Sequence, residues 1–324
     1  MKVQLVINFL LTFILLNLYL TKLKYDYLYD NNLSGFGSKK KTKTGCGIIF
    51  SFIVTINLIY ILIYDLNSAL FPNRFYVFLI SVFLLSVISF FDDLKSLDPR
   101  IRLIAQTVII YFSLTLVDVE YFDFPLKIMI FIYLMFWIYI TNITNFIDGS
   151  DGFLSVNTIS FFFGILILDQ YYPNTFFSYQ IAIIFLPVLL SFIFFNKPKA
   201  KLYMGDTGSI LIGYVIGFCL LELITTSYWY LSICLYSYPI LDCSITLLKK
   251  ILSGKSVFKR DFDYYFLKPI KKSQTNNYKI LAISIIYNLI NLLIIFFTLH
   301  FDNPYLVIFS IILSIGKINI FNKI

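Results

Sequence analysis

The chain has 324 residues, of which 59% are hydrophobic, 19% aromatic and only 14% charged. Its mean hydropathy of +0.82 is too high for a single globular domain that stays in solution, so the composition indicates a polytopic membrane protein. The formal net charge is +8, but its distribution along the chain is more informative than its total, and we expect no nucleic-acid partner.

Eleven apolar segments long enough to cross a bilayer are predicted. They begin at about residues 3, 46, 75, 101, 127, 152, 178, 208, 230, 279 and 303. The first has the length of a signal peptide, but a single lysine precedes it and no small-residue cleavage site follows, so we expect a retained helix. We therefore predict an all-α membrane protein, a bundle of about 10 to 11 transmembrane helices in a single domain over residues 1–324.

The basic residues predict the orientation of this bundle. If the N-terminus lies outside, all but three of the 26 Lys and Arg residues fall on the inner side, the exceptions being Lys2, Arg74 and Lys127. Because Lys and Arg accumulate in cytoplasmic loops, we expect an exterior N-terminus, a cytoplasmic C-terminus and a long, basic cytoplasmic loop at 249–279. The same orientation places every polar motif below on the cytoplasmic face, as one active-site groove.

The first motif is Asp92-Asp93-Leu94-Lys95, where the third apolar segment ends. Adjacent carboxylates repel each other, so a pair at an apolar boundary indicates a nearby cation, either a metal ion or a side chain such as Lys95. A solvated helix end is the alternative. Arg102 and Gln106, four residues apart in the next segment, are spaced to turn toward the same pocket.

The second motif, N-I-T-N-F-I-D-G-S-D-G, covers residues 142–152. Asn142, Asn145, Asp148 and Asp151 recur every three residues, so four polar groups would share one face of a helix. Polar side chains at membrane depth are a functional-site hypothesis by default. An interhelical amide network is the alternative, whereas a calcium loop is excluded because its remaining ligand positions are absent.

The third motif, M-G-D-T-G-S, covers residues 204–209 at the start of an apolar segment. A carboxylate, small residues and a helix N-terminus suit a metal-bound phosphate: Asp206 would hold the ion, while backbone N–H groups and Ser209 would meet phosphate oxygens. The spacing is not that of a Walker A loop. A plain turn before a helix is the alternative.

Together these segments resemble the polyprenyl-phosphate N-acetylhexosamine-1-phosphate transferases, a membrane family that begins lipid-linked glycans. The resemblance covers residues 44–261 and keeps the order of the family's motifs. Residues 92–95 are similar to its D-D-x-x-K element, 142–153 to N-x-x-N-x-x-D-G-x-D-G-L, 196–209 to N-x-x-x-A-K-x-x-M-G-D-T-G-S, 44–47 to a T-x-G-G-like turn, and Pro239 with Asp242 to a P-x-x-D pair. Phe153 stands where the second element has Leu.

The last long loop departs from the family pattern. Bacterial members carry an H-x-H-H element after an S-P-F-x-x-D-like run, whereas here the histidine positions fall on Tyr264, Phe266 and Leu267. The only histidine of the chain, His300, is expected in an outer loop and cannot replace them.

Some relatives grip the pyrophosphate with arginines, and Lys255, Lys259 and Arg260 are expected to do so here. The alternative is that these residues are ordinary cytoplasmic charge or attract anionic lipid.

The resemblance implies a Mg²⁺-dependent phosphoglycosyl transferase in the bacterial cytoplasmic membrane, with Mn²⁺ as a substitute ion. Undecaprenyl phosphate would attack the β-phosphorus of a UDP-N-acetylhexosamine, releasing UMP and starting a cell-envelope glycan such as lipopolysaccharide. The implied site residues are Asp206 and Asn145 for the metal; Asp92, Asp93, Asp148 and Asp151 for catalysis; and Lys95, Asn142, Lys201 and Ser209, with the loop cations, for the substrates.

Three alternatives stay open. The first is the family's phospho-MurNAc-pentapeptide transferase, against which the missing histidines argue. The second is a transporter or channel, although a transporter predicts midplane charges or broken helices in repeated halves. The third is a family member that lost catalysis. The hexosamine, the glycan, single or double displacement, and a homodimer are left open.

Overall fold

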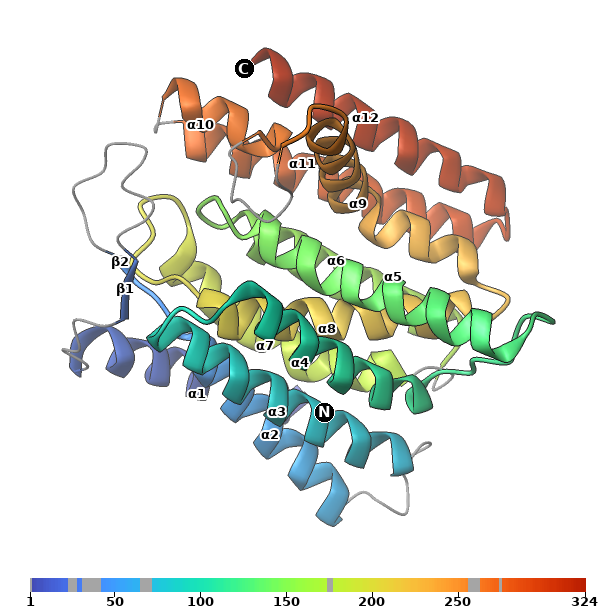
Figure 1. Cartoon of the computed structure of the whole chain (residues 1–324), viewed down its shortest axis with the longest axis horizontal. Helices are drawn as coiled ribbons and strands as arrows, with labels where there is room; N and C mark the ends of the chain where they lie inside the picture. The colour runs from blue at the N-terminus through green and yellow to red at the C-terminus, as the bar shows by residue number, and fades with distance from the viewer. Residues whose placement is uncertain are drawn as a thin grey trace.

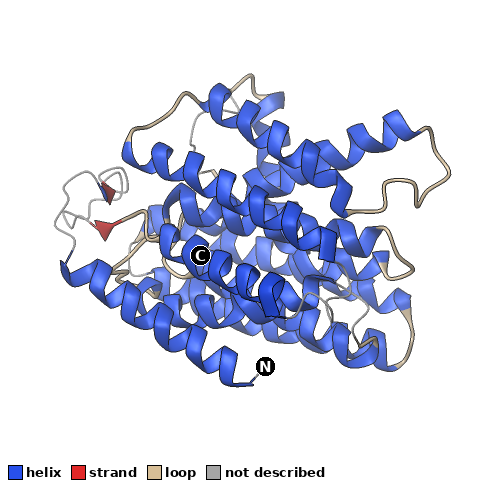
Figure 2. Cartoon of the chain, turned by 90° about the horizontal axis from the view of Figure 1, so that it is seen from below, coloured by secondary structure: helices blue, strands red, loops and turns tan. Residues whose placement is uncertain are grey.

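The computed structural model describes residues 2–22, 28–30, 42–64, 72–173, 177–255, 263–273 and 276–324. Within these residues the chain forms twelve α-helices, three short 3₁₀ helices and one antiparallel pair of two-residue strands. The long helices run side by side (Figure 1), and the strands are a small element at one edge of the bundle (Figure 2). The predicted all-α fold is confirmed.

The N-terminal half contains α1 (Lys2–Lys22), β1 (Tyr29–Asp30), β2 (Thr42–Lys43), α2 (Gly47–Tyr64), α3 (Pro72–Leu94), α4 (Pro99–Ser113), η3 (Leu114–Leu116) and α5 (Leu126–Ile147). The C-terminal half contains α6 (Phe153–Tyr171), α7 (Phe177–Asn196), α8 (Gly205–Ile224), α9 (Trp229–Leu252), η4 (Tyr265–Leu267), α10 (Lys268–Lys272), α11 (Asn276–His300), η5 (Pro304–Leu306) and α12 (Val307–Lys323). Each predicted apolar segment begins within a few residues of a helix, and the short α10 is the one addition among the described residues.

Helix length separates the spanning helices from three shorter ones, α2, α4 and the five-residue α10. In the part of the chain that the structure describes, nine helices are long and apolar enough to cross a membrane. The described part of α2 is shorter, and α4 has 15 residues, which at 1.5 Å per residue is about 22 Å against a hydrocarbon core of about 30 Å. The protein is thus a polytopic all-α membrane protein. Its helices α3 and α5 are long enough to span the membrane, and the shorter α4 packs against both.

α8 lies at the centre of the bundle. In an apolar 18-residue stretch of this helix 94% of the residues are buried, against 22% in the corresponding stretch of α1 and 17% in that of α11. Two glycines one turn apart on α8 face α5. A Cβ on Gly213 would lie 2.6 Å from the carbonyl oxygen of Thr141, and one on Gly217 would lie 2.4 Å from Cδ1 of Trp137. Small residues at this spacing let two helices approach closely. The contact fixes α5 against α8, and both helices carry predicted site residues.

The far end of α8 is tied to α7 by Glu222, a carboxylate with 5% exposure. Its oxygens accept hydrogen bonds from the backbone nitrogens of Phe177 at 3.0 Å and Ser178 at 2.9 Å. These N–H groups begin α7 and have no acceptor within that helix. The carboxylate of one helix therefore caps the next.

The C-terminal helices α9, α11 and α12, coloured orange to red in Figure 1, lie on the side of the bundle opposite α1, α2 and α3. α9 is not regular throughout. Its backbone leaves helical geometry at Tyr236 (φ −136°, ψ 21°), three residues before Pro239. A proline inside a helix lacks the N–H donor and crowds the preceding turn, which accounts for the kink.

Candidate active site

Segments far apart in the sequence meet at one end of the bundle, as the sequence analysis expected. The turn before α2 is joined to the loop before α8 by backbone hydrogen bonds, from Gly47 to Met204 at 2.9 Å and from Tyr203 to Lys43 at 2.8 Å. A Cβ on Gly47 would lie 2.1 Å from the backbone nitrogen of Gly208, so no residue with a side chain permits this approach.

Asp93 anchors the start of α8. Its carboxylate accepts hydrogen bonds from the backbone nitrogens of Asp206 (2.8 Å) and Thr207 (3.0 Å) and from the Thr207 hydroxyl (2.5 Å). The first N–H groups of a helix lack partners within it, and a carboxylate satisfies them well. Gly205 makes room for this contact, since a Cβ there would lie 2.5 Å from Oδ2 of Asp93. The catalytic role expected of Asp93 remains a prediction, but its hydrogen bonds show an anchoring role.

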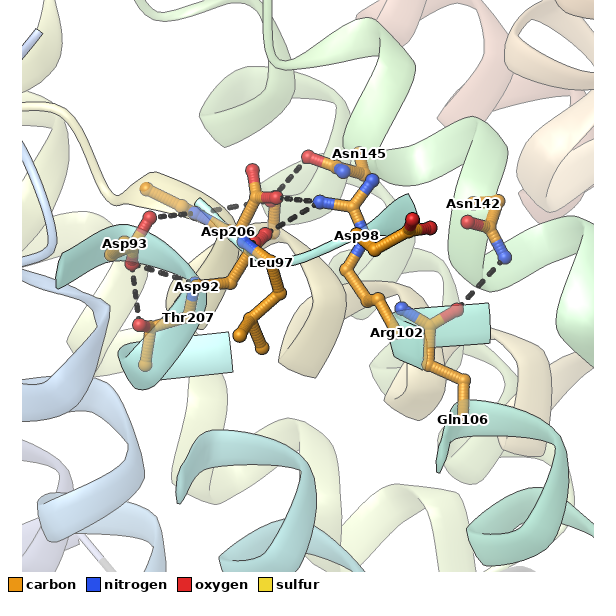
Figure 3. A network of polar contacts seen from close by, with 12 residues as sticks. Asp92, Asp93, Leu97, Asp98, Arg102, Gln106, Asn142, Asn145, Asp206 and Thr207 are labelled. Carbon is orange, nitrogen blue, oxygen red and sulfur yellow. Dashed lines mark hydrogen bonds and ion pairs between the residues drawn. The ribbon is translucent and has the colours of Figure 1, made fainter. Parts of the chain in front are cut away.

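Arg102 joins the carboxylates of Asp92 and Asp206, and these three residues with Asp93 are called the charge cluster below (Figure 3). Its Nη1 lies 2.6 Å from Oδ2 of Asp92 and also donates to Oδ2 of Asp206. Asp92 additionally accepts the backbone N–H of Leu97 at 2.7 Å, which fixes the turn between α3 and α4. One guanidinium therefore contacts two carboxylates that come from different helices.

Asn145, near the end of α5, is 5% exposed and lies against the start of α8. The hydroxyl of Ser209 is 2.9 Å from Oδ1 of Asn145 and 3.0 Å from the carbonyl oxygen of Gly205. One hydroxyl therefore connects the amide on α5 to the first turn of α8. The structure brings together the two residues expected at the metal, Asn145 and Asp206, on adjoining elements.

Asn142, one turn earlier on α5, contacts α4. Its Nδ2 donates to Oε1 of Gln106 at 3.1 Å and to the carbonyl oxygen of Ile138 at 2.9 Å. Gln106 is 1% exposed, and its Nε2 has no hydrogen-bond partner among the described residues. Arg102 and Gln106 thus both turn toward the cluster, as their spacing indicated (Figure 3).

Asp151 holds the loop between α7 and α8. Its oxygens accept hydrogen bonds from the backbone nitrogens of Lys199 (3.0 Å) and Ala200 (3.3 Å) and from the Tyr203 hydroxyl (3.1 Å). Burial raises the pKa of this carboxyl above its usual range, and the three donors oppose that rise. Asp148 is half-buried at the end of α5, where its backbone N–H donates to Asn145.

The predicted cations differ in their surroundings. Lys95 and Lys201 are exposed near the cluster ends of α3 and α8. Lys255, also exposed, has its Nζ 3.3 Å from Asp263. Lys259 and Arg260 lie outside the described residues.

The positions expected to carry histidines in the family form a buried clamp. Tyr264, Phe266 and Leu267 are all less than 9% exposed. The ring of Phe266 stacks on that of Phe153, with 4.5 Å between centroids and 10° between planes. Phe153 is the other residue that departs from the family pattern. The residues at two positions that differ from the family pattern, Phe153 and Phe266, are therefore in contact. Asp242 holds the backbone of Phe266 by accepting its N–H at 3.1 Å.

The donor set fits a magnesium ion that shares its coordination with phosphate. Mg²⁺ usually keeps several waters and takes one or two carboxylates plus substrate phosphates. Asp206 and Asp92 supply partly exposed carboxylates, and Asn145 an amide oxygen. Among the described residues no group of three or more His, Cys, Asp or Glu side chains encloses an ion, so these residues do not form a closed protein cage for a metal.

From the sequence, Arg102 was expected to turn toward the pocket but was assigned no role there, whereas in the structure it contacts both Asp92 and Asp206. Its spacing to Gln106 was the available signal. Nothing in the sequence indicated which carboxylates it would join, because Asp206 is 104 residues away.

Comparison with known proteins agrees with this site. The profile of glycosyl transferase family 4 matches residues 75–224, which hold all three polar motifs. The phospho-N-acetylmuramoyl-pentapeptide-transferase of Thermotoga neapolitana is 29% identical over 308 residues, 89% of this chain and 95% of the relative. The undecaprenyl-phosphate alpha-N-acetylglucosaminyl 1-phosphate transferase of Thermotoga maritima is 27% identical over 224 residues, 68% of this chain and 70% of the relative.

A third relative, the probable undecaprenyl-phosphate N-acetylglucosaminyl 1-phosphate transferase of Bacillus subtilis, is 27% identical over 198 residues, 56% of this chain and 54% of that protein. The fold and site define a polytopic membrane protein with a charged cluster at one end of its bundle. Between residues 75 and 224 the chain is similar to glycosyl transferase family 4, and the phosphosugar transferases above resemble it over longer stretches.

Proposed function

We propose that the protein transfers N-acetylhexosamine 1-phosphate from a UDP-sugar to undecaprenyl phosphate, releasing UMP and starting a lipid-linked glycan of the cell envelope. The observation that carries the proposal is the cluster in which Arg102 joins Asp92 and Asp206 beside the start of α8. The names of the Thermotoga and Bacillus relatives support the two substrates.

This reaction needs positioned phosphates and charge control more than covalent help from the protein. Phosphoryl transfer is catalysed mainly by alignment of the attacking and leaving oxygens and by neutralisation of their charge. Arg102 has further N–H donors for phosphate oxygens besides the one that its carboxylates share. Asp92, which pairs with Arg102, would orient the lipid phosphate or accept its remaining proton.

Asp206 and Asn145 are the residues that would hold Mg²⁺. The bound ion would supply charge that neutralises the diphosphate and stabilises UMP as a leaving group. The protein's own part is to fix both ligands: Asp93 holds the backbone of Asp206, and Ser209 holds the Asn145 amide.

The donor diphosphate would be bound by Lys255, Lys259 and Arg260, because the histidine positions of the family form the buried clamp. Lys95 and Lys201, both exposed beside the cluster, would attract the phosphates. We place this end of the bundle in the cytoplasm and the N-terminus outside, on the distribution of basic residues.

A second function has support from one observation: the Thermotoga neapolitana relative, named for transfer of phospho-N-acetylmuramoyl-pentapeptide, matches along 95% of its length. In that case the donor would be UDP-MurNAc-pentapeptide. The buried Tyr264, Phe266 and Leu267 favour the hexosamine donor instead, because they leave no imidazole in this segment.

The test is UMP release by membranes containing the full chain, supplied with undecaprenyl phosphate and one donor at a time. UDP-GlcNAc and UDP-GalNAc should give UMP only when lipid phosphate is present, and the matched variant Asp206→Asn should give none. Release with UDP-MurNAc-pentapeptide alone would establish the second function. No release with any of the three donors would reject both transferase functions and favour a lapsed enzyme or a transporter.

A further inference from the structure

Lys317 is a buried lysine inside the helix bundle. It lies on α12 with 1% exposure, and its Nζ has no hydrogen-bond partner among the described residues. Its surroundings are aromatic: Nζ is 4.0 Å from the ring centre of Tyr238, 5.1 Å from that of Phe153 and 5.9 Å from that of Phe321. Ring faces attract an ammonium group, most strongly where water is excluded. An ionisable side chain at this depth calls for a functional explanation.

The opposite charge that acts on Lys317 belongs to Asp242, and Tyr238 contacts both residues. Asp242 is fully buried, and the Tyr238 hydroxyl donates to its Oδ2 at 2.8 Å. The same carboxylate accepts the backbone N–H groups of Tyr265 at 2.9 Å and Phe266 at 3.1 Å. A charged acceptor makes such hydrogen bonds stronger than a neutral one would.

Phe266, a residue of the buried clamp, is connected to Lys317 through Phe153. Phe266 stacks on Phe153, and Phe153 is one of the rings that face Lys317. Beside this stack, a Cβ on Gly149 would lie 3.4 Å from Leu267. Lys317, Tyr238, Asp242, Phe266 and Phe153 therefore form a closed circuit that joins the segment 263–273 to the turn between α5 and α6.

We propose that Lys317 is a positioning residue. Its charge holds Asp242 and Phe153 in place, and through them it fixes the segment 263–273 against the turn that carries Asp148 and Asp151. In the sequence the segment follows Lys259 and Arg260, and the turn carries Asp148 and Asp151, so we expect the loss of Lys317 to weaken donor binding. This consequence for the donor rests on the proposed function, whereas the fixing of the segment does not.

The first test measures hydrogen exchange of backbone amides in the full chain, reconstituted in lipid nanodiscs. Lys317→Met keeps an apolar stem of similar length and removes the charge. It should speed exchange at Tyr265 and Phe266 by at least ~10-fold, because a buried carboxylate that loses its opposite charge holds its partners less well. The control Lys323→Met changes an exposed lysine on the same helix and should leave exchange at both amides unchanged.

A double-variant cycle tests whether Lys317 acts through Asp242. Asp242→Asn alone should also speed exchange, and adding Lys317→Met to it should have little further effect, since residues in one network are not additive. Fully additive effects would overturn the circuit. If Lys317→Met does not fold, Phe266→Leu opens the circuit from its other end and must speed exchange at Tyr265; unchanged exchange there would equally overturn it.

The second test measures turnover against each substrate. In Lys317→Met the KM for the UDP-sugar should rise by about 10-fold while the KM for undecaprenyl phosphate stays the same, and Lys317→Arg should restore most of the loss. Equal changes in both KM values would show a merely structural role. Faster exchange in Lys317→Met, in a protein whose unaltered form has no transferase activity, would reject the proposed function and leave the fixing of the segment established.

Discussion

The Asp93 carboxylate on α3 accepts two hydrogen bonds from Thr207 on α8, one from the backbone N–H at 3.0 Å and one from the hydroxyl at 2.5 Å. Asp92, the preceding residue in the chain, contacts Arg102 instead. Two adjacent carboxylates are thus tolerated because each has its own donors. One fixes the start of a helix, and the other pairs with Arg102.

This division predicts different effects for the same substitution. Asp93→Asn should destabilise the protein by about 1 to 3 kcal/mol, because one amide oxygen replaces a charged acceptor of three hydrogen bonds. Thermal unfolding of the purified protein measures this loss. Asp92→Asn is the matched control: turnover should fall sharply with a smaller change in Tm. Equal Tm losses in the two variants would contradict the division.

Asp206→Asn should lower metal-dependent turnover by at least ~100-fold, because a neutral oxygen replaces a charged ligand of the expected ion. Initial rates over a series of Mg²⁺ concentrations measure this effect. Asp123→Asn makes the same chemical change on an exposed loop and should leave the rates unaltered. Near-normal turnover of Asp206→Asn at limiting Mg²⁺ would mean that the ion binds elsewhere.

Arg260→Ala should raise the KM for the UDP-sugar more than Lys255→Ala does. Arginine presents a planar fork to phosphate oxygens, whereas the Lys255 ammonium lies 3.3 Å from Asp263 and shares its charge with that carboxylate. Steady-state kinetics of the two single variants and of Lys259→Ala measure the order. Unchanged kinetics in all three variants would show that these basic residues take no part in donor binding and are ordinary charged residues of a cytoplasmic loop.

The same loop predicts a flat pH dependence. A hydrogen bond from Lys271 holds the pKa of Asp263 below its usual range. A lowered acid pKa keeps the carboxylate charged at neutral pH, and its pairing is lost only as the pH falls through that lowered value. Donor KM should therefore show no step between about pH 6 and 8, where an imidazole would titrate. A step near ~6.5 that is absent in His300→Asn would contradict this account.

The orientation is tested by labelling single cysteines in a cysteine-free variant. Asp123 and Ser273 are exposed at opposite ends of the described bundle, whereas Ser178 is fully buried and unsuited to labelling. In intact cells an impermeant thiol reagent should label Asp123→Cys and not Ser273→Cys. The reverse pattern would place the charge cluster outside the cell.

Much of the fold could be predicted from the sequence because a membrane helix needs a long apolar run, and such runs are visible without any partner. The short α4 shows the limit of that signal. Its 15 residues were expected to form a span like the others, yet only a helix shorter than the hydrocarbon core is formed. The segment ends at Ser113, whose hydroxyl bonds to Tyr214 on α8, a contact that no local pattern encodes.

The site was predictable as a set of residues but not as a set of contacts. Spacing placed Asn142 and Asn145 on one helical face, but it did not show that one meets Gln106 on α4 and the other Ser209 on α8. The missing histidines were evident from the sequence. That Phe266 would turn inward onto Phe153 was not, because stacking between residues so far apart depends on how whole helices pack.

The central helix is held at both ends. Asp93 accepts hydrogen bonds from its first turn, and Glu222, near its last turn, accepts hydrogen bonds from the start of α7. Between them, two glycines allow close packing against α5. A sliding or rotation of α8 would therefore break hydrogen bonds at both of its ends at once, so its position along and about its axis is fixed by the helices around it.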